Sequence, residues 1–207
     1  MIERFNTDLA GRPTLVTGNS QLPFGGMGQL TENVVINVKN KSHAVTAEVT
    51  IPDSGAEGVI VAQGGMFGGW SLYLKDGRPA YAYNLLGVQH FDVDSDTNVP
   101  SGTHQVRMEF TFDGGGLGKG GDVALYLDGE KTGEGRLTAT VPLAFSGDET
   151  CDIGSDTASP VSDQYTPEGS RFTGTVEWVQ IDIADAAEDL DHLISPEERL
   201  NIALARQ

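Results

Sequence analysis

The sequence predicts an all-β protein, an antiparallel β-sandwich that ends in one short helix. Apolar and polar residues alternate over segments such as residues 34–38 and 45–49, as in strands with one buried face. The chain also contains 27 glycines, which favours many short strands joined by tight turns. No helical repeat of similar quality precedes residue 184. At 207 residues, the chain is long enough to bury one complete sandwich core.

Turn residues place the predicted hairpins. Asp128-Gly129 separates two alternating runs and favours a type I′ turn, since this pair tolerates positive φ angles. Residues 75–78 mark a second hairpin in the same way. The glycine-rich stretch 114–121 lacks the spacing of a Walker loop and precedes a strand, which favours a mobile connection over a phosphate site.

The predicted strands fill one central domain. We expect a glycine- and proline-rich N-terminal arm or linker over residues 1–30, a sandwich domain over 31–184, and an acidic segment with a helix over 185–207. The strands are expected near residues 33–39, 43–51, 58–63, 69–75, 79–84, 89–94, 103–112, 122–127, 131–137, 151–153 and 171–183.

The last segment has a complete helix start signal. Ser195 can cap the helix, Pro196 suits its first position, and Glu198 completes a capping box. Leu200, Leu204 and Ile194 are expected to share an apolar face that docks on the sandwich itself, in preference to a partner.

The charge of the chain excludes one class of partner. The formal net charge is −17, so a phosphate backbone would be repelled and nucleic acid is not an expected partner. No apolar run approaches the length of a membrane span, and residues 1–6 show no signal peptide. A single cysteine, Cys151, fits a reducing compartment. We therefore expect a soluble protein, cytoplasmic as given, or periplasmic or secreted if the chain is a piece of an exported protein.

Aromatic strand residues give one candidate binding surface. Because successive side chains of a strand point to opposite faces of the sheet, Trp70 shares a face with Leu72 and Leu74, and Tyr81 shares one with Tyr83. Aromatic rings on a concave sheet can stack on sugars, with neighbouring polar groups supplying hydrogen bonds. The alternative is ordinary sandwich packing. The candidate glycan surface consists of Trp70, Tyr81, Tyr83, Asn84 and His90.

An acidic segment gives a candidate metal site. Asp148, Asp152 and Asp156 stand among turn residues, where carboxylates and free carbonyls could bind calcium, the one cofactor considered. The alternatives are an acidic rim or aspartates that cap turns. No catalytic residue is nominated, because the four histidines are scattered and no serine stands in a G-x-S-x-G elbow.

Long blocks of the sequence resemble a known family. The blocks NVKNKSHAVTAEVTIP, GVIVAQGGMFGGWSLYLKDGRPAYAYN, VRMEFTFDGGGLGKGGDVALYLDGEKTGEG and ETCDIGSDTASPVSDQY are similar to the C-terminal accessory domain of bacterial arylsulfatases. The resemblance covers about residues 3–184, and residues 3–16 are similar to the segment that joins that domain to its catalytic neighbour. It implies a concanavalin-like jelly roll that packs against a sulfatase catalytic domain and helps to shape the substrate entrance.

The resemblance does not extend to catalysis. Family sulfatases make formylglycine from the cysteine of C-x-P-S-R, in a large N-terminal domain that also holds calcium. Here Cys151 is followed by Asp-Ile-Gly-Ser, so no catalytic residue can be assigned and the chain is not expected to be an enzyme. Two functions remain: a structural or protein-interaction module beside a sulfatase domain, which also allows self-association, and a carbohydrate-binding module.

Overall fold

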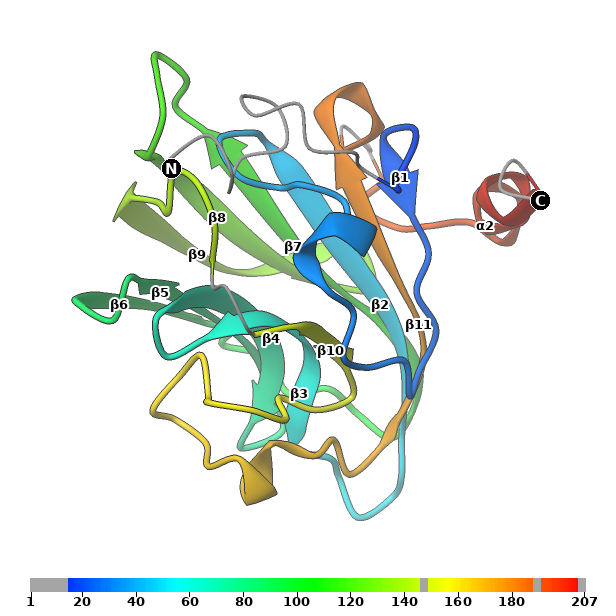
Figure 1. The fold of residues 1–207 in the computed structure, drawn as a ribbon. Coiled ribbons are helices and arrows are strands. Elements are labelled where there is room, and N and C mark those ends of the chain that lie inside the picture. The colour runs from blue at the N-terminus through cyan, green and yellow to red at the C-terminus, as the bar shows by residue number, and fades with distance from the viewer. Residues whose placement is uncertain (1–14, 146–148, 188–190, 205–207) are drawn as a thin grey trace.

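Two antiparallel β-sheets pack face to face in the computed structural model (Figure 1), which describes residues 15–145, 149–187 and 191–204. Every pairing between strands is antiparallel, and the chain crosses repeatedly from one sheet to the other. The predicted fold class, an antiparallel concanavalin-like jelly roll with a short C-terminal helix, is confirmed.

The larger sheet, sheet A, has six strands and the smaller, sheet B, has five. In spatial order, sheet A contains β1 (Ser20–Gln21), β11 (Thr175–Ile183), β2 (His43–Ile51), β7 (Gly102–Phe112), β8 (Lys119–Leu127) and β9 (Glu130–Ala139). Sheet B contains β10 (Cys151–Ile153), β3 (Gly58–Gly65), β4 (Gly68–Lys75), β5 (Arg78–Leu85) and β6 (Gln89–Asp94).

The Asp-Gly pairs form the predicted hairpins. Asp76 and Gly77 have φ angles of 52° and 73°, and Asp128 and Gly129 have φ angles of 50° and 84°. Two consecutive positive φ angles define a type I′ turn, whose twist matches that of the strands it joins. The two pairs join β4 to β5 and β8 to β9, respectively.

One predicted strand, residues 33–39, is absent. The chain forms a short 3-10 helix, η2 (Glu32–Val34), and continues without sheet pairing. Val35, Ile36 and Val38 are nevertheless buried in the core. The apolar run therefore indicated burial and not strand pairing, because a segment without sheet hydrogen bonds can also direct its apolar side chains into the core. Two further 3-10 helices, η3 (Glu168–Ser170) and η4 (Ala184–Ala187), flank β11.

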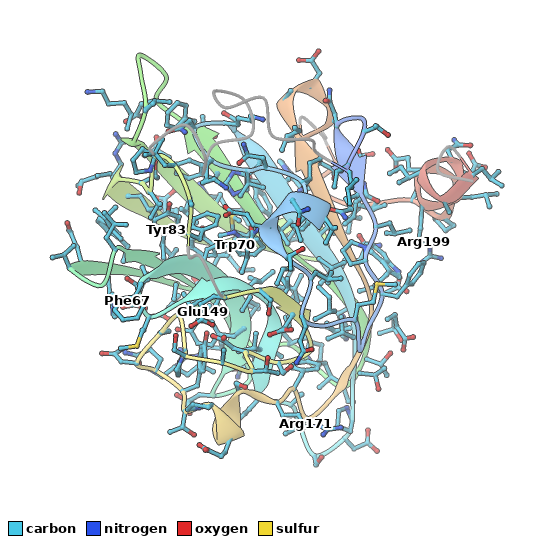
Figure 2. All side chains as sticks on the ribbon, viewed as in Figure 1. Phe67, Trp70, Tyr83, Glu149, Arg171 and Arg199 are labelled. Carbon is cyan, nitrogen blue, oxygen red and sulfur yellow. The ribbon has the colours of Figure 1, made fainter. Side chains whose placement is uncertain are left out.

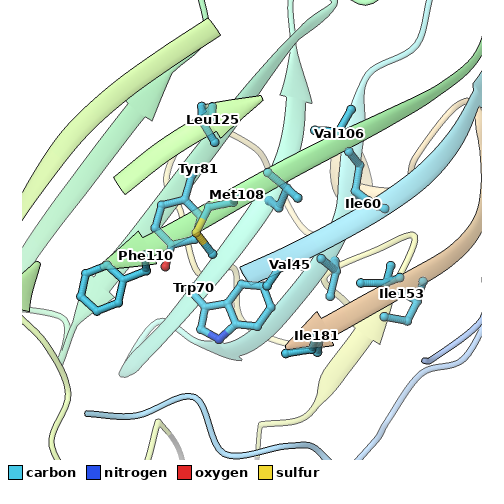
Figure 3. Packing of buried hydrophobic residues seen from close by; sticks show 14 of the residues in the cluster. Val45, Ile60, Trp70, Tyr81, Val106, Met108, Phe110, Leu125, Ile153 and Ile181 are labelled. Carbon is cyan, nitrogen blue, oxygen red and sulfur yellow. The ribbon is translucent and has the colours of Figure 1, made fainter. Parts of the chain in front are cut away.

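The main core lies between the sheets. Trp70 and Tyr81 of sheet B extend towards Val45 and Met108 of sheet A (Figure 3). A second, smaller cluster covers the outer face of sheet B, where Tyr73 packs against Tyr165 of the segment after β10, with ring centroids 5.3 Å apart. The predicted grouping is thus confirmed: Trp70, Leu72 and Leu74 share one face, which points into the core between the sheets, and Tyr73 lies on the other.

The C-terminal helix α2 (Pro196–Leu204) begins as predicted. The Glu198 amide donates to Ser195 Oγ at 3.2 Å, and the Ser195 amide donates to Glu198 Oε2 at 2.8 Å, which is a reciprocal capping box. Leu200 and Leu204 of the predicted apolar face are not buried, since they are 58% and 56% exposed. Ile194, the third residue of the predicted face, is buried, and Arg199 lies over the Trp178 ring at 5.2 Å. The helix therefore contacts its own sandwich through Arg199, although none of its residues is buried, and Ile194 precedes it.

Candidate functional site

The predicted glycan surface is not accessible. Trp70, Tyr81 and Tyr83 expose 0%, 1% and 5% of their area, and all three belong to the core between the sheets. The Trp70 indole donates to Gln63 Oε1 at 3.0 Å, and Tyr83 Oη accepts a bond from the Val141 amide at 2.8 Å. Because their rings are enclosed by other side chains, they cannot stack on a sugar. The glycan expectation is corrected at these positions in favour of sandwich packing.

Asn84 is also buried, and it organises the structure around it. Its side-chain nitrogen donates to the carbonyls of Met66 and Val161 at 3.1 Å, and lies 3.3 Å from that of Gly65. Its oxygen accepts the Gly87 amide at 2.8 Å. One amide side chain therefore joins two hairpin turns and the loop that covers sheet B. Its neighbour across the sheet, His90, is exposed, so it alone of the five predicted residues faces solvent.

The turns joined by Asn84 carry an exposed apolar surface, which we call the hairpin patch. It consists of Met66 (50% exposed), Phe67 (64%), Leu86 (52%) and Val88 (81%). The first two residues form the turn between β3 and β4, and the others belong to the turn between β5 and β6. Figure 2 shows Phe67 at the periphery of the molecule. Exposed single apolar residues are common, but four large ones on adjoining turns form a contiguous site.

The backbone of the hairpin patch is fixed in a demanding conformation. Leu86 has a φ angle of 56° and is followed by Gly87 at 70°, and the Val88 amide donates to the Leu85 carbonyl at 3.0 Å. A bulky residue with positive φ costs conformational energy, and such costs tend to collect at functional positions. Leucine therefore stands at a position of this turn where asparagine or glycine is usual.

Asp152 and Asp156 are satisfied by hydrogen-bond donors from loops. Asp152 accepts the Gln29 amide at 2.5 Å and the Thr157 hydroxyl at 2.6 Å. Asp156 accepts the Val161 amide at 2.9 Å and the Tyr165 hydroxyl at 2.7 Å, and burial raises its pKa. Asp148 lies outside the described residues. Within the described ranges, no group of three or more histidine, cysteine, aspartate or glutamate side chains could hold a metal ion. The turn-capping alternative therefore accounts for Asp152 and Asp156.

A groove runs beside β10 and is named here the arm groove. It has a volume of about 660 Å³, and the chain before η2 forms one of its walls. Arg171 lines it and is exposed at the base of the molecule in the view of Figure 2. The other lining residues used below are Gly25, Met27, Gly28, Asp152, Ser155, Thr157 and Thr175.

The outer face of sheet A carries polar residues and is partly covered by the C-terminal segment. Arg107 is fully buried there: it donates to Thr46 Oγ1 at 2.9 Å, to Glu109 Oε1 at 2.7 Å and to the Ala187 carbonyl at 3.1 Å. Beside it lies a shallow hollow of about 640 Å³. There Arg136 forms ion pairs with Asp113 and Asp122, so its charge is already satisfied within the protein.

No catalytic arrangement is found in the described part of the chain. Cys151 is completely buried, and burial raises the pKa of its thiol to about 12, so it stays protonated and unreactive. Within the described residues, no hydrogen bond links a histidine ring to a serine hydroxyl or to Cys151. Among the same residues, no helix is long and apolar enough to cross a membrane.

Sequence reasoning missed both the hairpin patch and the arm groove. The patch left a signal, since the apolar pair Met66-Phe67 stands between glycines at a turn, where polar residues are usual. No local sequence pattern indicates the arm groove. It forms where segments distant in the sequence meet, and a lone arginine gives no pattern.

Comparison with known proteins adds similarity of fold. No family model and no curated protein matches the chain. Among solved structures, the CBM40 module of Ruminococcus gnavus IT-sialidase bound to alpha2,3 sialyllactose is similar over 80% of this chain and 83% of its own, at 13% identity and a TM-score of 0.47. A heptameric SAP-like pentraxin from Limulus polyphemus matches over 82% and 79%, at 14% identity and a TM-score of 0.45.

Domains LG4-5 of the mouse laminin alpha1 chain match over 86% of this chain and 42% of their own, at 17% identity and a TM-score of 0.45. At such identities, a structural likeness concerns the fold alone. The name of a sulfatase does not occur among these structures.

Proposed function

We propose that this chain is a noncatalytic β-sandwich module that docks through the hairpin patch onto a protein partner, a sulfatase-type catalytic domain. The single observation that carries the proposal is the cluster of Met66, Phe67, Leu86 and Val88, four large apolar side chains exposed on adjoining turns. Methionine and aromatic residues are enriched in the centres of protein interfaces, where charged residues are depleted.

The rigidity of the patch supports docking. The buried Asn84 side chain joins the two turns, because it bonds the Met66 carbonyl of one and the Gly87 amide of the other. Both turns connect paired strands of sheet B. A surface that is fixed before binding loses little conformational entropy when the partner arrives. The patch therefore resembles a preformed interface and not a mobile loop.

The resemblance in sequence supports the choice of partner. The blocks shared with the arylsulfatase accessory domain include two residues of the hairpin patch, Met66 and Phe67, whereas Leu86 and Val88 lie just beyond the block that ends at Asn84. In that family, the accessory domain lies against the catalytic domain. The same role, performed by a module without its own nucleophile, agrees with the burial of Cys151.

The alternative function, carbohydrate binding, is not proposed at the residues first considered for it. Trp70, Tyr81 and Tyr83 are core residues, and Asn84 uses both ends of its amide within the fold. A glycan would therefore have to bind elsewhere on the surface.

The test is association with a bacterial arylsulfatase that lacks its own C-terminal accessory domain, followed by sedimentation velocity. We expect a one-to-one complex that Phe67→Ser weakens at least about tenfold, as for a central interface residue. Leu86→Ser and Leu117→Ser form a matched pair, since each leucine is 52% exposed but only Leu86 belongs to the patch.

Leu86→Ser is expected to weaken the complex, and Leu117→Ser is expected to leave it unchanged. No complex at about 100 µM, or equal effects of the two leucine variants, would refute the proposal. The isolated chain should not hydrolyse an aryl sulfate ester, and measurable turnover would refute the noncatalytic assignment.

A further inference from the structure

Arg171 presents an unpaired guanidinium in a strongly acidic protein. The chain has a net charge of −17, yet no ion pair or side-chain hydrogen bond joins Arg171 to any described residue. By contrast, Arg107, Arg136 and Arg199 each contact a carboxylate. An arginine left unpaired among so many acidic residues, and lining a groove, can bind an anion from outside.

The backbone holds Arg171 in place. Arg171 forms a parallel bridge with Val59 of β3, and the Phe172 amide donates to the Gly154 carbonyl at 3.0 Å. Gly58 lies so close that a Cβ atom there would stand 2.5 Å from the Arg171 carbonyl oxygen. The guanidinium therefore projects from a fixed position on the edge of sheet B.

The opposite wall of the arm groove is also built by close approach of main chain. A Cβ atom on Gly25 would lie 1.8 Å from the Val176 carbonyl oxygen, and one on Gly28 would lie 2.9 Å from Asp152 Oδ1. Glycine at these positions lets residues 25–28 lie directly against β11 and β10. Side chains would otherwise push this wall away.

Asp152, the other charged residue that lines the arm groove, is almost completely buried. Its side chain belongs to a residue that is only 4% exposed, and its two oxygens accept bonds from the Gln29 amide and from the Thr157 amide and hydroxyl. These donors satisfy the carboxylate from within the protein. The exposed charge of the groove is that of Arg171.

The remaining lining has the character of a site for sugars. Ser155, Thr157 and Thr175 contribute hydroxyl groups, and Met27, which is 43% exposed, contributes an apolar surface. Hydroxyls and backbone groups can exchange hydrogen bonds with a polyol, and its C–H faces can pack on a thioether. The volume, about 660 Å³, falls within the roughly 300–1,000 Å³ usual for small-molecule sites.

We propose that the arm groove binds an anionic saccharide, with Arg171 holding its sulfate or carboxylate group. The preference for a sulfate ester rests on the proposed function, because a module beside a sulfatase meets sulfated substrates. Binding itself does not depend on that function. A guanidinium forms paired, charge-assisted hydrogen bonds with either anion.

The test is calorimetric titration of the full chain at low salt with three tetrasaccharides: a sulfated galactose oligomer, its desulfated counterpart and a galacturonate oligomer. We expect the sulfated oligomer to bind and the desulfated one to bind at least about tenfold more weakly. Galacturonate binding would show that carboxylate is also accepted. If only galacturonate bound, the arm groove would still be an anion-binding site, but its ligand would be a carboxylate and not a sulfate ester.

Two matched variants locate the site. Arg171→Ala should reduce affinity at least about tenfold. Arg78→Ala should have no effect, since Arg78 is likewise exposed and without an ion pair to a described residue but lies at the start of β5, outside the groove. Thr175→Trp should block the groove while the circular dichroism of the sheets is unchanged.

Equal losses in Arg171→Ala and Arg78→Ala, equal affinity for the desulfated oligomer, or no binding of either anionic oligomer at millimolar concentration would each overturn the proposal. Phe67→Ser should still bind the saccharide. If the chain formed the sulfatase complex but bound no saccharide, only this inference would be refuted. If it bound the saccharide but formed no complex, only the docking function would be refuted.

Discussion

The imidazole of His192 stacks on the phenol ring of Tyr126, with ring centroids 4.0 Å apart and an angle of 17° between the planes. The same imidazole forms a hydrogen bond from Nδ1 to Glu109 Oε1 at 2.8 Å. His192 belongs to the C-terminal segment, whereas Tyr126 and Glu109 stand on β8 and β7. This contact attaches the end of the chain to the outer face of sheet A.

The stack should contribute measurably to stability. His192→Ala is expected to lower the free energy of unfolding by about 1–2 kcal/mol, because it removes the ring contact and the bond to Glu109. His192→Phe should lose less, since it keeps a ring over Tyr126. His90→Ala, at an exposed position, is the control and should change stability by less than about 0.5 kcal/mol. Urea denaturation measures all three, and equal stability of the two alanine variants would contradict the expectation.

Deletion of residues 185–207 should leave the sandwich folded but less stable. The deletion removes the Ala187 carbonyl that accepts a bond from Arg107, and also the two bonds between Gln105 and Ile194. Arg107 would then become accessible to water. We expect an unchanged β-sheet circular dichroism signal and a loss of a few kcal/mol, which is on the order of 10 °C in Tm. Loss of the sheet signal would show that the segment is essential for folding, and sedimentation of the same sample reports any change in oligomeric state.

Asn84 should be among the most sensitive polar residues. Asn84→Ala leaves the carbonyls of Met66 and Val161 and the amide of Gly87 without their partner at a buried position. We expect a loss of roughly 2–3 kcal/mol, because unsatisfied buried groups lose the hydration they had in the unfolded chain. Asn98→Ala is the matched control, at an exposed turn position. Similar unfolding free energies for the two variants would show that Asn84 does not join the turns as described.

Acid should destabilise the fold through His43. Burial lowers the pKa of this imidazole from 6.5 to about 4, although its contact with the Lys41 carbonyl acts in the opposite direction. Between these two values, the unfolded chain binds a proton that the folded chain does not. Stability is therefore lost as the pH falls from about 6.5 to 4, by roughly 3 kcal/mol in total.

The comparison with His43→Phe isolates this effect, because phenylalanine does not titrate and can pack against Phe110, as the imidazole does at 5.3 Å. The difference in free energy of unfolding between the wild type and His43→Phe should fall by roughly 3 kcal/mol between pH 7 and pH 4. If the free energies of unfolding of the two proteins changed in parallel with pH, His43 would not be the group that causes the loss of stability in acid. If phenylalanine prevents folding, His43→Asn serves the same purpose.

The sequence was informative where local rules decide the structure. Asp-Gly turns, strand faces and the Ser195 capping box depend on a few adjacent residues, and all were predicted correctly. The strand expected at 33–39 was wrong because its apolar residues are buried without pairing to a sheet. Trp70 and Tyr83 were assigned to a possible surface because periodicity shows which residues share a face but not which face points outward.

The two candidate sites depend on contacts between distant segments. The hairpin patch requires that two turns become neighbours, and the arm groove requires that residues 25–28 lie beside 152–157 and 171–176. Neither relationship has a local signature. The acidic aspartates were recognised as a group, but only the fold reveals that Asp152 and Asp156 already have donors.

An isolated antiparallel β-bridge between Leu30 and Cys151 determines how short a fragment of the chain can be made without exposing the edge of sheet B. The Leu30 amide donates to the Cys151 carbonyl at 3.1 Å, and the Cys151 amide donates back to the Leu30 carbonyl at 2.8 Å. Residues 27–30 thus shield the outer margin of β10, which would otherwise offer free backbone groups to another molecule. A fragment trimmed at Thr31 would present that bare margin and should self-associate, so an expression boundary belongs before Met27.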